Sequence, residues 1–226
     1  MPNASPRQFA SQPVGDIAAS LPGAAALFRR HGLNFCCHGQ ATLADAAAAR
    51  GLPLPAIEAE LGSLGSLAGD VRASGLPEDT AALIDHVVTR YHAVHRRELP
   101  ELIDLARRVE RVHAEVDDAP HGLAVLLEAM EQDLTDHMAK EEQVLFPMMR
   151  SGGNAMIAGP IGVMRHEHDA HAEMLRTLEH LTHGHAPPEG ACTSWRALYA
   201  GTRKLADDLV AHMHIENAIL FPRFGA

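Results

Sequence analysis

The sequence predicts an all-α protein, in which an antiparallel four-helix bundle follows a small helical N-terminal domain. Ala and Leu are abundant and aromatic residues make up only 4% of the chain, a composition that favours helices over pleated sheets. The C-terminal part carries long stretches of helical pattern that are separated by segments rich in Gly and Pro. Short connections are typical of helices that run antiparallel to their neighbours, so these stretches predict a bundle.

The small N-terminal domain is predicted over residues 1–61. Gly32 is placed to end a first short helix over 24–31, because Gly adopts the left-handed conformation of a helix C-terminus at little cost. Thr42 with Asp45 resembles a capping box, in which the two residues satisfy free N–H groups at the start of the next helix. A further short helix is predicted before the domain ends.

The bundle itself is predicted over residues 77–226. Residues 62–76 are rich in Gly and Ser, which is typical of a linker between domains. Pro100 predicts a kink in the first long helix, since Pro cannot donate a helical hydrogen bond. The long helices are predicted over residues 78–112, 121–147, 160–183 and 193–222.

Charge and composition exclude several classes of partner. The net charge is −10 and no basic run is present, which argues against nucleic acid and anionic membranes as partners. No uncharged apolar run of the length needed to span a bilayer occurs, and residues 1–17 lack the pattern of a signal peptide. The 3 cysteines do not form the pattern of a secreted disulfide framework. We therefore expect a cytoplasmic location.

An internal repeat carries the clearest functional signal. The segment His137–Pro147 reads HMAKEEQVLFP and the segment His212–Pro222 reads HMHIENAILFP, with 6 identical positions. In both segments a His precedes a Glu by one helical turn, so the two side chains lie on the same face of the helix. Facing helices in a bundle can combine such pairs into a metal site. The repeat therefore predicts His137, Glu141, His212 and Glu216 as ligands.

The other helices should supply the remaining ligands at the same depth in the bundle. His86 and His168 both lie about two turns into their helices, the level that faces the His–Glu pairs. His95 is too deep, whereas His92 is less clearly excluded. The apolar positions of the helix over 160–183 place His168 inward, and His171 also points inward but is interpreted as a core histidine.

The resulting donor set favours iron. Mixed nitrogen and oxygen ligation suits iron, with zinc or manganese as alternatives, and the absence of a thiolate counts against a structural zinc site. Two metal ions that share two carboxylates stay below six ligands each. A bridging oxygen and open positions for small molecules are then expected.

With these residues in place, the chain resembles the iron–sulfur cluster repair di-iron proteins, the family named for repair of iron centres, over nearly its whole length. In the N-terminal part the similarity lies in Leu27–Arg30 and in the loop Phe35-Cys36-Cys37-His38-Gly39. In the C-terminal part it lies in motifs similar to a hemerythrin-like domain: Ile84-Asp85-His86, Arg90-Tyr91-His92, His137-x₃-Glu141, Glu167-His168-Asp169 and His212-x₃-Glu216. One departure is His38, where Gly is expected in relatives.

The resemblance implies a function and a ligand set. The implied function is to protect or repair iron–sulfur clusters damaged by nitric oxide or oxidative stress, through nitric oxide binding and reduction, iron donation, or both. Nitric oxide, or another small ligand, and damaged iron–sulfur proteins are then the partners, and a homodimer is an open option. The cofactor is two non-haem iron ions with a bridging oxygen. The implied ligands, which include His86 in preference to His92, are His86, His137, Glu141, His168, His212 and Glu216.

The adjacent thiols of Cys36 and Cys37 are candidates for redox chemistry, because thiols near a helix N-terminus have lowered pKa values and react readily. We expect them to handle electrons, nitric oxide or iron transiently, whereas Cys192 is interpreted as a small apolar residue. The competing functions are a hemerythrin-like protein that binds oxygen or nitric oxide reversibly and a sensor. The oxygen carrier would be expected to have five histidine ligands and no cysteine domain.

Overall fold

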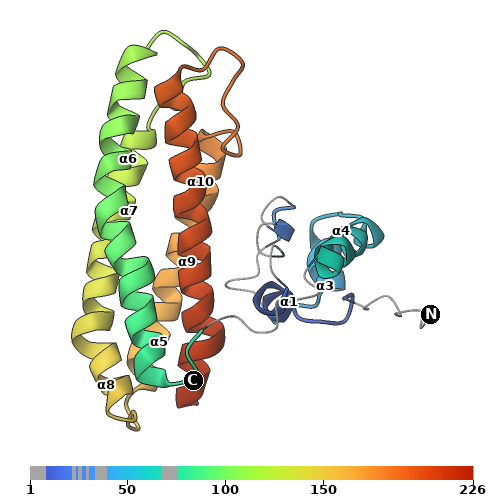
Figure 1. The fold of residues 1–226 in the computed structure, drawn as a ribbon, viewed down its shortest axis with the longest axis vertical. Coiled ribbons are helices and arrows are strands. Elements are labelled where there is room, and N and C mark those ends of the chain that lie inside the picture. Colours follow the sequence, from blue (N-terminus) through green and yellow to red (C-terminus); the bar gives the residue numbers. More distant parts are fainter. Residues whose placement is uncertain are drawn as a thin grey trace. The chain divides into compact units, whose positions relative to one another are not determined.

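The computed structural model describes residues 9–21, 24, 27–28, 31–33, 40–67 and 76–225, with the side chains of 19–20 and 63–67 left aside. The chain divides into two compact units, Met1–Leu76 and Pro77–Ala226. The described parts of both units are built on helices (Figure 1). This agrees with the all-α fold class that the sequence predicts.

The first unit contains three helices whose bounds the structure describes: α1 (Val14–Ser20), α3 (Leu43–Ala49) and α4 (Leu54–Leu67). Thr42 caps α3 as predicted, because its hydroxyl oxygen accepts from the backbone N–H of Asp45 at 3.2 Å, and the Asp45 carboxylate accepts from the Thr42 hydroxyl at 2.6 Å. Helix α4 runs to Leu67, so the first part of the segment predicted as a linker is helical. The predicted cysteine loop, with Cys36, Cys37 and His38, lies outside the described residues. The apolar core of this unit includes Val14, Ile17, Leu27, Phe28, Leu43, Ile57 and Leu61.

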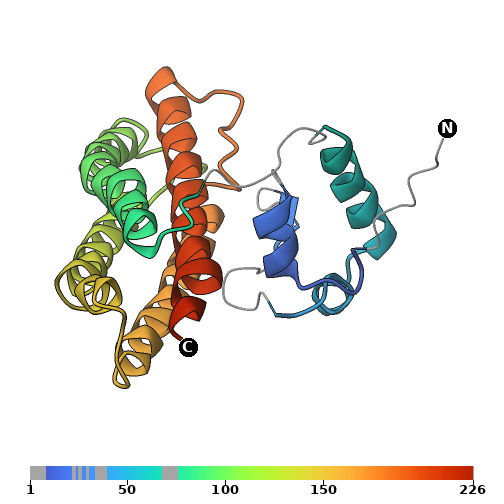
Figure 2. The same ribbon diagram turned by 60° about the horizontal axis from the view of Figure 1, so that its bottom comes forward.

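Four long helical runs form the second unit and pack side by side (Figure 2). The first run joins α5 (Thr80–Val87), the π-helix η1 (Val88–His92) and α6 (Ala93–Val112). The second joins α7 (Leu123–Lys140), the π-helix η2 (Glu141–Leu145) and α8 (Phe146–Arg150). The third is α9 (Ala158–Leu181), and the fourth joins α10 (Thr193–His214), the π-helix η3 (Ile215–Leu220) and the 3₁₀-helix η4 (Phe221–Phe224).

Each π-helix widens its helical run where a candidate ligand sits. The backbone N–H of Phe146 bonds to the carbonyl of Glu141, and that of Phe221 bonds to the carbonyl of Glu216, each five residues earlier. Pro follows in both cases and lacks the N–H that a regular helix would use, so the wider turn accommodates it. Single π turns are frequent at functional sites. The first run departs from α geometry at η1, whereas α6 continues through Pro100.

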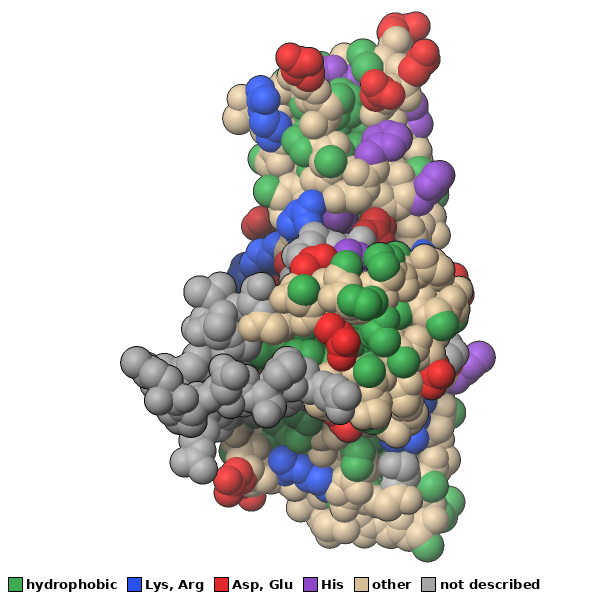
Figure 3. All heavy atoms as spheres, turned by 90° about the vertical axis from the view of Figure 1, so that its right-hand side faces the viewer, with side chains coloured by type: hydrophobic (Ala, Val, Ile, Leu, Met, Phe, Trp, Pro, Cys, Tyr) green, Lys and Arg blue, Asp and Glu red, His purple; other side chains and the backbone are tan. Residues whose placement is uncertain are grey.

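The interior of the bundle is mostly apolar, and its buried histidines and glutamates gather around one level. Leu83, Ile84, Leu134, Phe146 and Leu220 are among the fully buried side chains. Histidines are present on the surface (Figure 3), yet six are buried inside the bundle: His92, His95, His137, His168, His171 and His212. Within the described residues, no helix is long and apolar enough to cross a membrane.

Candidate metal centre

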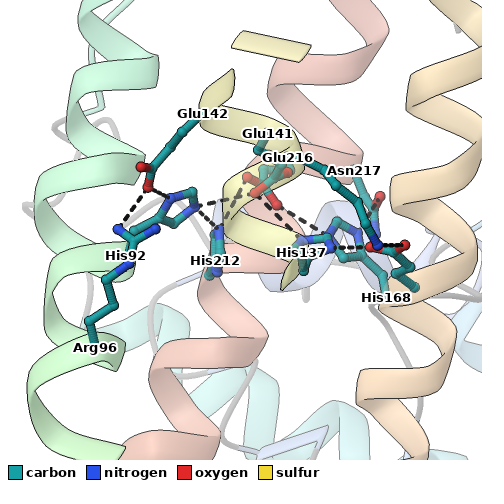
Figure 4. A network of polar contacts seen from close by, with 11 residues as sticks. His92, Arg96, His137, Glu141, Glu142, His168, His212, Glu216 and Asn217 are labelled. Carbon is teal, nitrogen blue, oxygen red and sulfur yellow. Dashed lines mark hydrogen bonds and ion pairs between the residues drawn. The ribbon is translucent and has the colours of Figure 1, made fainter. Parts of the chain in front are cut away.

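Four imidazoles and two carboxylates converge in the middle of the bundle (Figure 4). Each of the four helical runs contributes one of the histidines, and the second and fourth runs add one Glu each. These side chains have at most 1% of their surface exposed: His92, His137, Glu141, His168, His212 and Glu216. The site therefore lies in the dry core, where charged groups are held only if they are paired or bind a cation.

The donors form two groups that could each hold a metal ion. One contains His92 and His212, the other contains His137 and His168, and both include Glu141 and Glu216. We refer to the two sets of imidazoles as the His92–His212 pair and the His137–His168 pair. Because the carboxylates belong to both groups, the geometry is that of two neighbouring cation positions with shared ligands.

The Glu141 and Glu216 carboxylates connect the two pairs. Oε2 of Glu141 lies 3.3 Å from Nε2 of His92 and 3.5 Å from Nε2 of His137. Oε1 of Glu216 lies 3.1 Å from Nε2 of His212, and its Oε2 lies 3.2 Å from Nε2 of His168. Each carboxylate thus reaches one imidazole of each pair, as a bridging ligand would.

The outward nitrogens of three of these imidazoles donate to polar side chains. Nδ1 of His92 donates to Oε1 of Glu142 at 2.7 Å, which Arg96 also contacts. Nδ1 of His137 donates to Oε2 of Glu167 at 2.9 Å, and Lys140 pairs with the same carboxylate. Nδ1 of His168 donates to Oδ1 of Asn217 at 3.0 Å. Acceptors of this kind fix the ring and its tautomer in metal sites.

The donor set fits a bound cation. A proton on Nδ1 leaves a lone pair on Nε2, and the Nε2 atoms of His137 and His168 face each other at 3.2 Å. The Nε2 atoms of His92 and His212 lie 3.0 Å apart. Both oxygens of Glu141 are buried without a hydrogen-bond donor among the residues described here. Facing lone pairs and undonated carboxylate oxygens repel one another, and a metal ion between them removes that repulsion.

Burial keeps the imidazoles of His92 and His137 in the neutral form that binds metals. Burial, together with the neighbouring His212, lowers the pKa of His92 to about 4. Burial also lowers the pKa of His137, with a further contribution from His168. In contrast, burial and the nearby Glu216 carboxylate raise the pKa of Glu141 in the metal-free protein. A bound cation would favour the charged carboxylate instead.

The structure differs from the sequence prediction at one position of the donor set. It brings together five of the predicted residues, but places His92 rather than His86 with them. His86 is only half-buried, and its ring packs edge-on against Tyr91 with 5.9 Å between centroids. The prediction of His86 assumed that the second long helix ends at Pro147. The helical run continues to Arg150, so the level of the site lies further along the first helix, at His92.

The sequence analysis did not identify the residues that support the ligand imidazoles. Asp133, which lies one turn before His137, is exposed, and Glu167 from another helix accepts from the His137 imidazole. Glu142 accepts from the His92 imidazole in the same way. Their position directly beside a ligand in sequence was the available signal. His171 is buried as expected, and its ring lies 4.8 Å from that of His137.

An antiparallel helical bundle with an interior four-histidine, two-carboxylate donor set defines a hemerythrin-like metal-binding protein. Residues 83–224 match the family model described as the hemerythrin HHE cation binding domain. Residues 10–65 match the ScdA_N model, described as a domain of unknown function. Buried His and Glu groups inside such a domain are suited to a non-haem iron centre.

Curated relatives narrow the class to one family. The chain is 47% identical to the iron-sulfur cluster repair protein YtfE of Citrobacter koseri, over 95% of this chain and 97% of the relative. It is 46% identical to YtfE of Escherichia coli O157:H7, with the same coverage. It is 48% identical to YtfE of Cronobacter sakazakii, over 95% of this chain and 96% of the relative. The chain therefore belongs to the YtfE family of iron-sulfur cluster repair proteins, and the resemblance found in the sequence is confirmed.

Proposed function

We propose that this protein is a non-haem di-iron protein that protects or repairs iron–sulfur clusters damaged by nitric oxide or oxidative stress. The observation that carries the proposal is the pair of adjacent donor groups that share Glu141 and Glu216. The names of the relatives, which are iron-sulfur cluster repair proteins, support cluster repair as the function of this site. Damaged iron–sulfur proteins are accordingly the proposed partners.

The proposed ligand set is one His pair and both carboxylates for each of two iron ions, with a bridging oxygen. Iron bound there supplies redox chemistry and open positions for nitric oxide or another small ligand. The chain's own part is to bury the donors, exclude bulk water and hold the outward protons at Nδ1 of His92, His137 and His168. Glu142 holds the His92 ring, and Glu167 holds the His137 ring. The side chain of Arg96 pairs with Glu142, and that of Lys140 pairs with Glu167. Nitric oxide reduction is the enzymatic activity that such a site would provide.

Iron donation is the second arm of the proposal. Cys36 and Cys37 are the proposed thiols that handle iron, nitric oxide or electrons between the bundle and a damaged cluster. The matched N-terminal domain supports a repair function over an oxygen carrier. The two donor groups also contain four histidines, whereas the carrier would be expected to have five.

Iron quantitation and a repair assay test the proposal together. Full-length protein is loaded with Fe(II) without oxygen, and iron content and the optical spectrum are compared with those of His137→Ala. We expect two irons per chain in the wild type and fewer in the variant. Fewer than two irons in the loaded wild type would contradict the dinuclear centre.

The loaded protein is then added to a [4Fe–4S] enzyme inactivated by nitric oxide. Iron-loaded protein should restore more activity than the metal-free protein, and Cys36→Ser with Cys37→Ser should reduce the gain. Equal recovery with loaded and metal-free protein would contradict iron donation. A stable oxygenated form in air, without repair, would favour the reversible carrier.

A further inference from the structure

The sequence repeat relates the surroundings of the two His pairs as well as the ligands. Glu142 follows Glu141, and Asn217 follows Glu216 at the equivalent position of the second copy. In the partner helices, Tyr91 directly precedes His92, and Glu167 directly precedes His168. Each half of the centre therefore has two equivalent positions from which a side chain can reach the outward Nδ1 of a ligand. The two halves can therefore be compared position by position.

In the half with the His137–His168 pair, both positions carry hydrogen-bond acceptors. Glu167 accepts from Nδ1 of His137, and the Asn217 amide oxygen accepts from Nδ1 of His168. Glu167 is also paired with Lys140. Both imidazoles of this half are therefore held in place by an acceptor on the outward nitrogen.

In the half with the His92–His212 pair, one acceptor is missing. Glu142 accepts from Nδ1 of His92. Nδ1 of His212 is buried and has no hydrogen-bond partner in the described part of the chain. Tyr91, which directly precedes His92 as Glu167 precedes His168, stacks its ring on His212, with 5.5 Å between centroids and 6° between planes. An aromatic face covers His212 where a carboxylate supports His137.

This difference has a direct consequence for metal affinity. An acceptor on the outward nitrogen increases the basicity of a ligating imidazole, and loss of such a partner costs roughly 10- to 100-fold in metal affinity. Stacking restrains the His212 ring, but it provides no hydrogen-bond acceptor for Nδ1. The shared carboxylates, Glu141 and Glu216, contribute to both positions and so do not offset the difference.

We propose that the two iron positions are unequal, and that the one held by the His92–His212 pair fills last and empties first. The inference rests on the proposed dinuclear function and deepens it. It identifies the iron at this position as the one available for donation, while the iron at the His137–His168 pair stays in the protein. Tyr91 is a positioning residue that keeps the iron affinity of the position at the His92–His212 pair low.

Iron release to a chelator tests the inequality. The full chain is loaded with two Fe(II) ions without oxygen and mixed with excess chromogenic Fe(II) chelator. Two release phases of equal amplitude are expected, with rates that differ by about tenfold or more. Tyr91→Glu places an acceptor near Nδ1 of His212 and should slow the fast phase alone. Tyr91→Phe keeps the stacked ring and should change neither phase.

A variant of the other half provides the opposite test. Asn217→Leu removes the acceptor of His168 and should accelerate the slow phase while the fast phase is unchanged. Thermal melting of each metal-free variant separates altered release from altered folding, and Asn217→Leu remains informative if Tyr91→Glu does not fold. Release of both irons in one phase, or a Tyr91→Glu effect on the slow phase, would overturn the inference. Uptake of fewer than two irons would instead contradict the proposed function.

Discussion

The second and fourth helical runs of the bundle carry the same sequence pattern, but the residues around that pattern differ between them. Both carry a His and a Glu one turn apart, a π-helix at the Glu, and a Pro after Leu and Phe. One turn before the His, the copies also share an aspartate, Asp133 in the second run and Asp208 in the fourth. The shared residues supply the ligands, and the neighbours of each copy decide how those ligands are supported.

The two aspartates show this most clearly. Asp208 is buried, and both of its oxygens bind Arg90, at 2.7 and 3.1 Å, while Lys204 pairs with it as well. Burial raises the pKa of Asp208, but the bonds from Arg90 and Lys204 outweigh it, so the pKa lies below its ordinary value. Asp133 is exposed. The same residue in the same frame therefore has a structural role in one copy only.

The largest expected effect comes from removing what the copies share. Glu141→Ala or Glu216→Ala takes a donor from both metal positions, so each variant should lose most of the iron that the wild type binds. Metal analysis after anaerobic loading measures this loss. Glu128→Ala, at a half-buried position of the second run that lies outside both donor groups and pairs with Arg107, is the matched control and should retain full iron. A Glu141→Ala protein that binds two irons with wild-type affinity would show that the carboxylate is not a ligand.

A smaller effect is expected from removing one imidazole of one pair. His92→Ala should reduce iron binding to about one ion per chain, because the His137–His168 pair keeps its own donors. His86→Ala should leave both ions in place, because His86 lies outside both donor groups. The same iron assay distinguishes the two variants. Loss of iron in His86→Ala, with none in His92→Ala, would restore the assignment predicted from the sequence.

The smallest expected effect is on the free energy of unfolding, and it distinguishes Asp208 from Asp133. Asp208→Asn weakens a buried charged network and should lower the free energy of unfolding by about 1 to 2 kcal/mol. Asp133→Asn should change it by less than about 0.5 kcal/mol, as is usual for exposed positions. Urea unfolding of the metal-free proteins measures both, free of any effect on metal binding. Equal destabilisation by the two substitutions would contradict the contrast between the copies.

The sequence predicted the helices because their signals are local. Helical pattern, Gly and Pro breaks and the Thr42 cap depend on neighbours along the chain, and the structure contains them. The ends of the helices differ from the prediction. The second run passes Pro147 and reaches Arg150 because η2 accommodates the proline. That extension displaced the predicted ligand from His86 to His92.

By itself, the sequence determined the helical fold and, through its repeat, the ligands from the second and fourth runs, since a His and a Glu one turn apart must share a helical face. Only the tertiary structure decided which histidine of the first run joins them. That choice depends on how far one helix slides along another, and side-chain packing between helices sets it. The tertiary structure alone also showed that Glu167 supports His137 while Tyr91 covers His212, because the position of a residue beside one ligand does not show which side chain of a neighbouring helix it will contact.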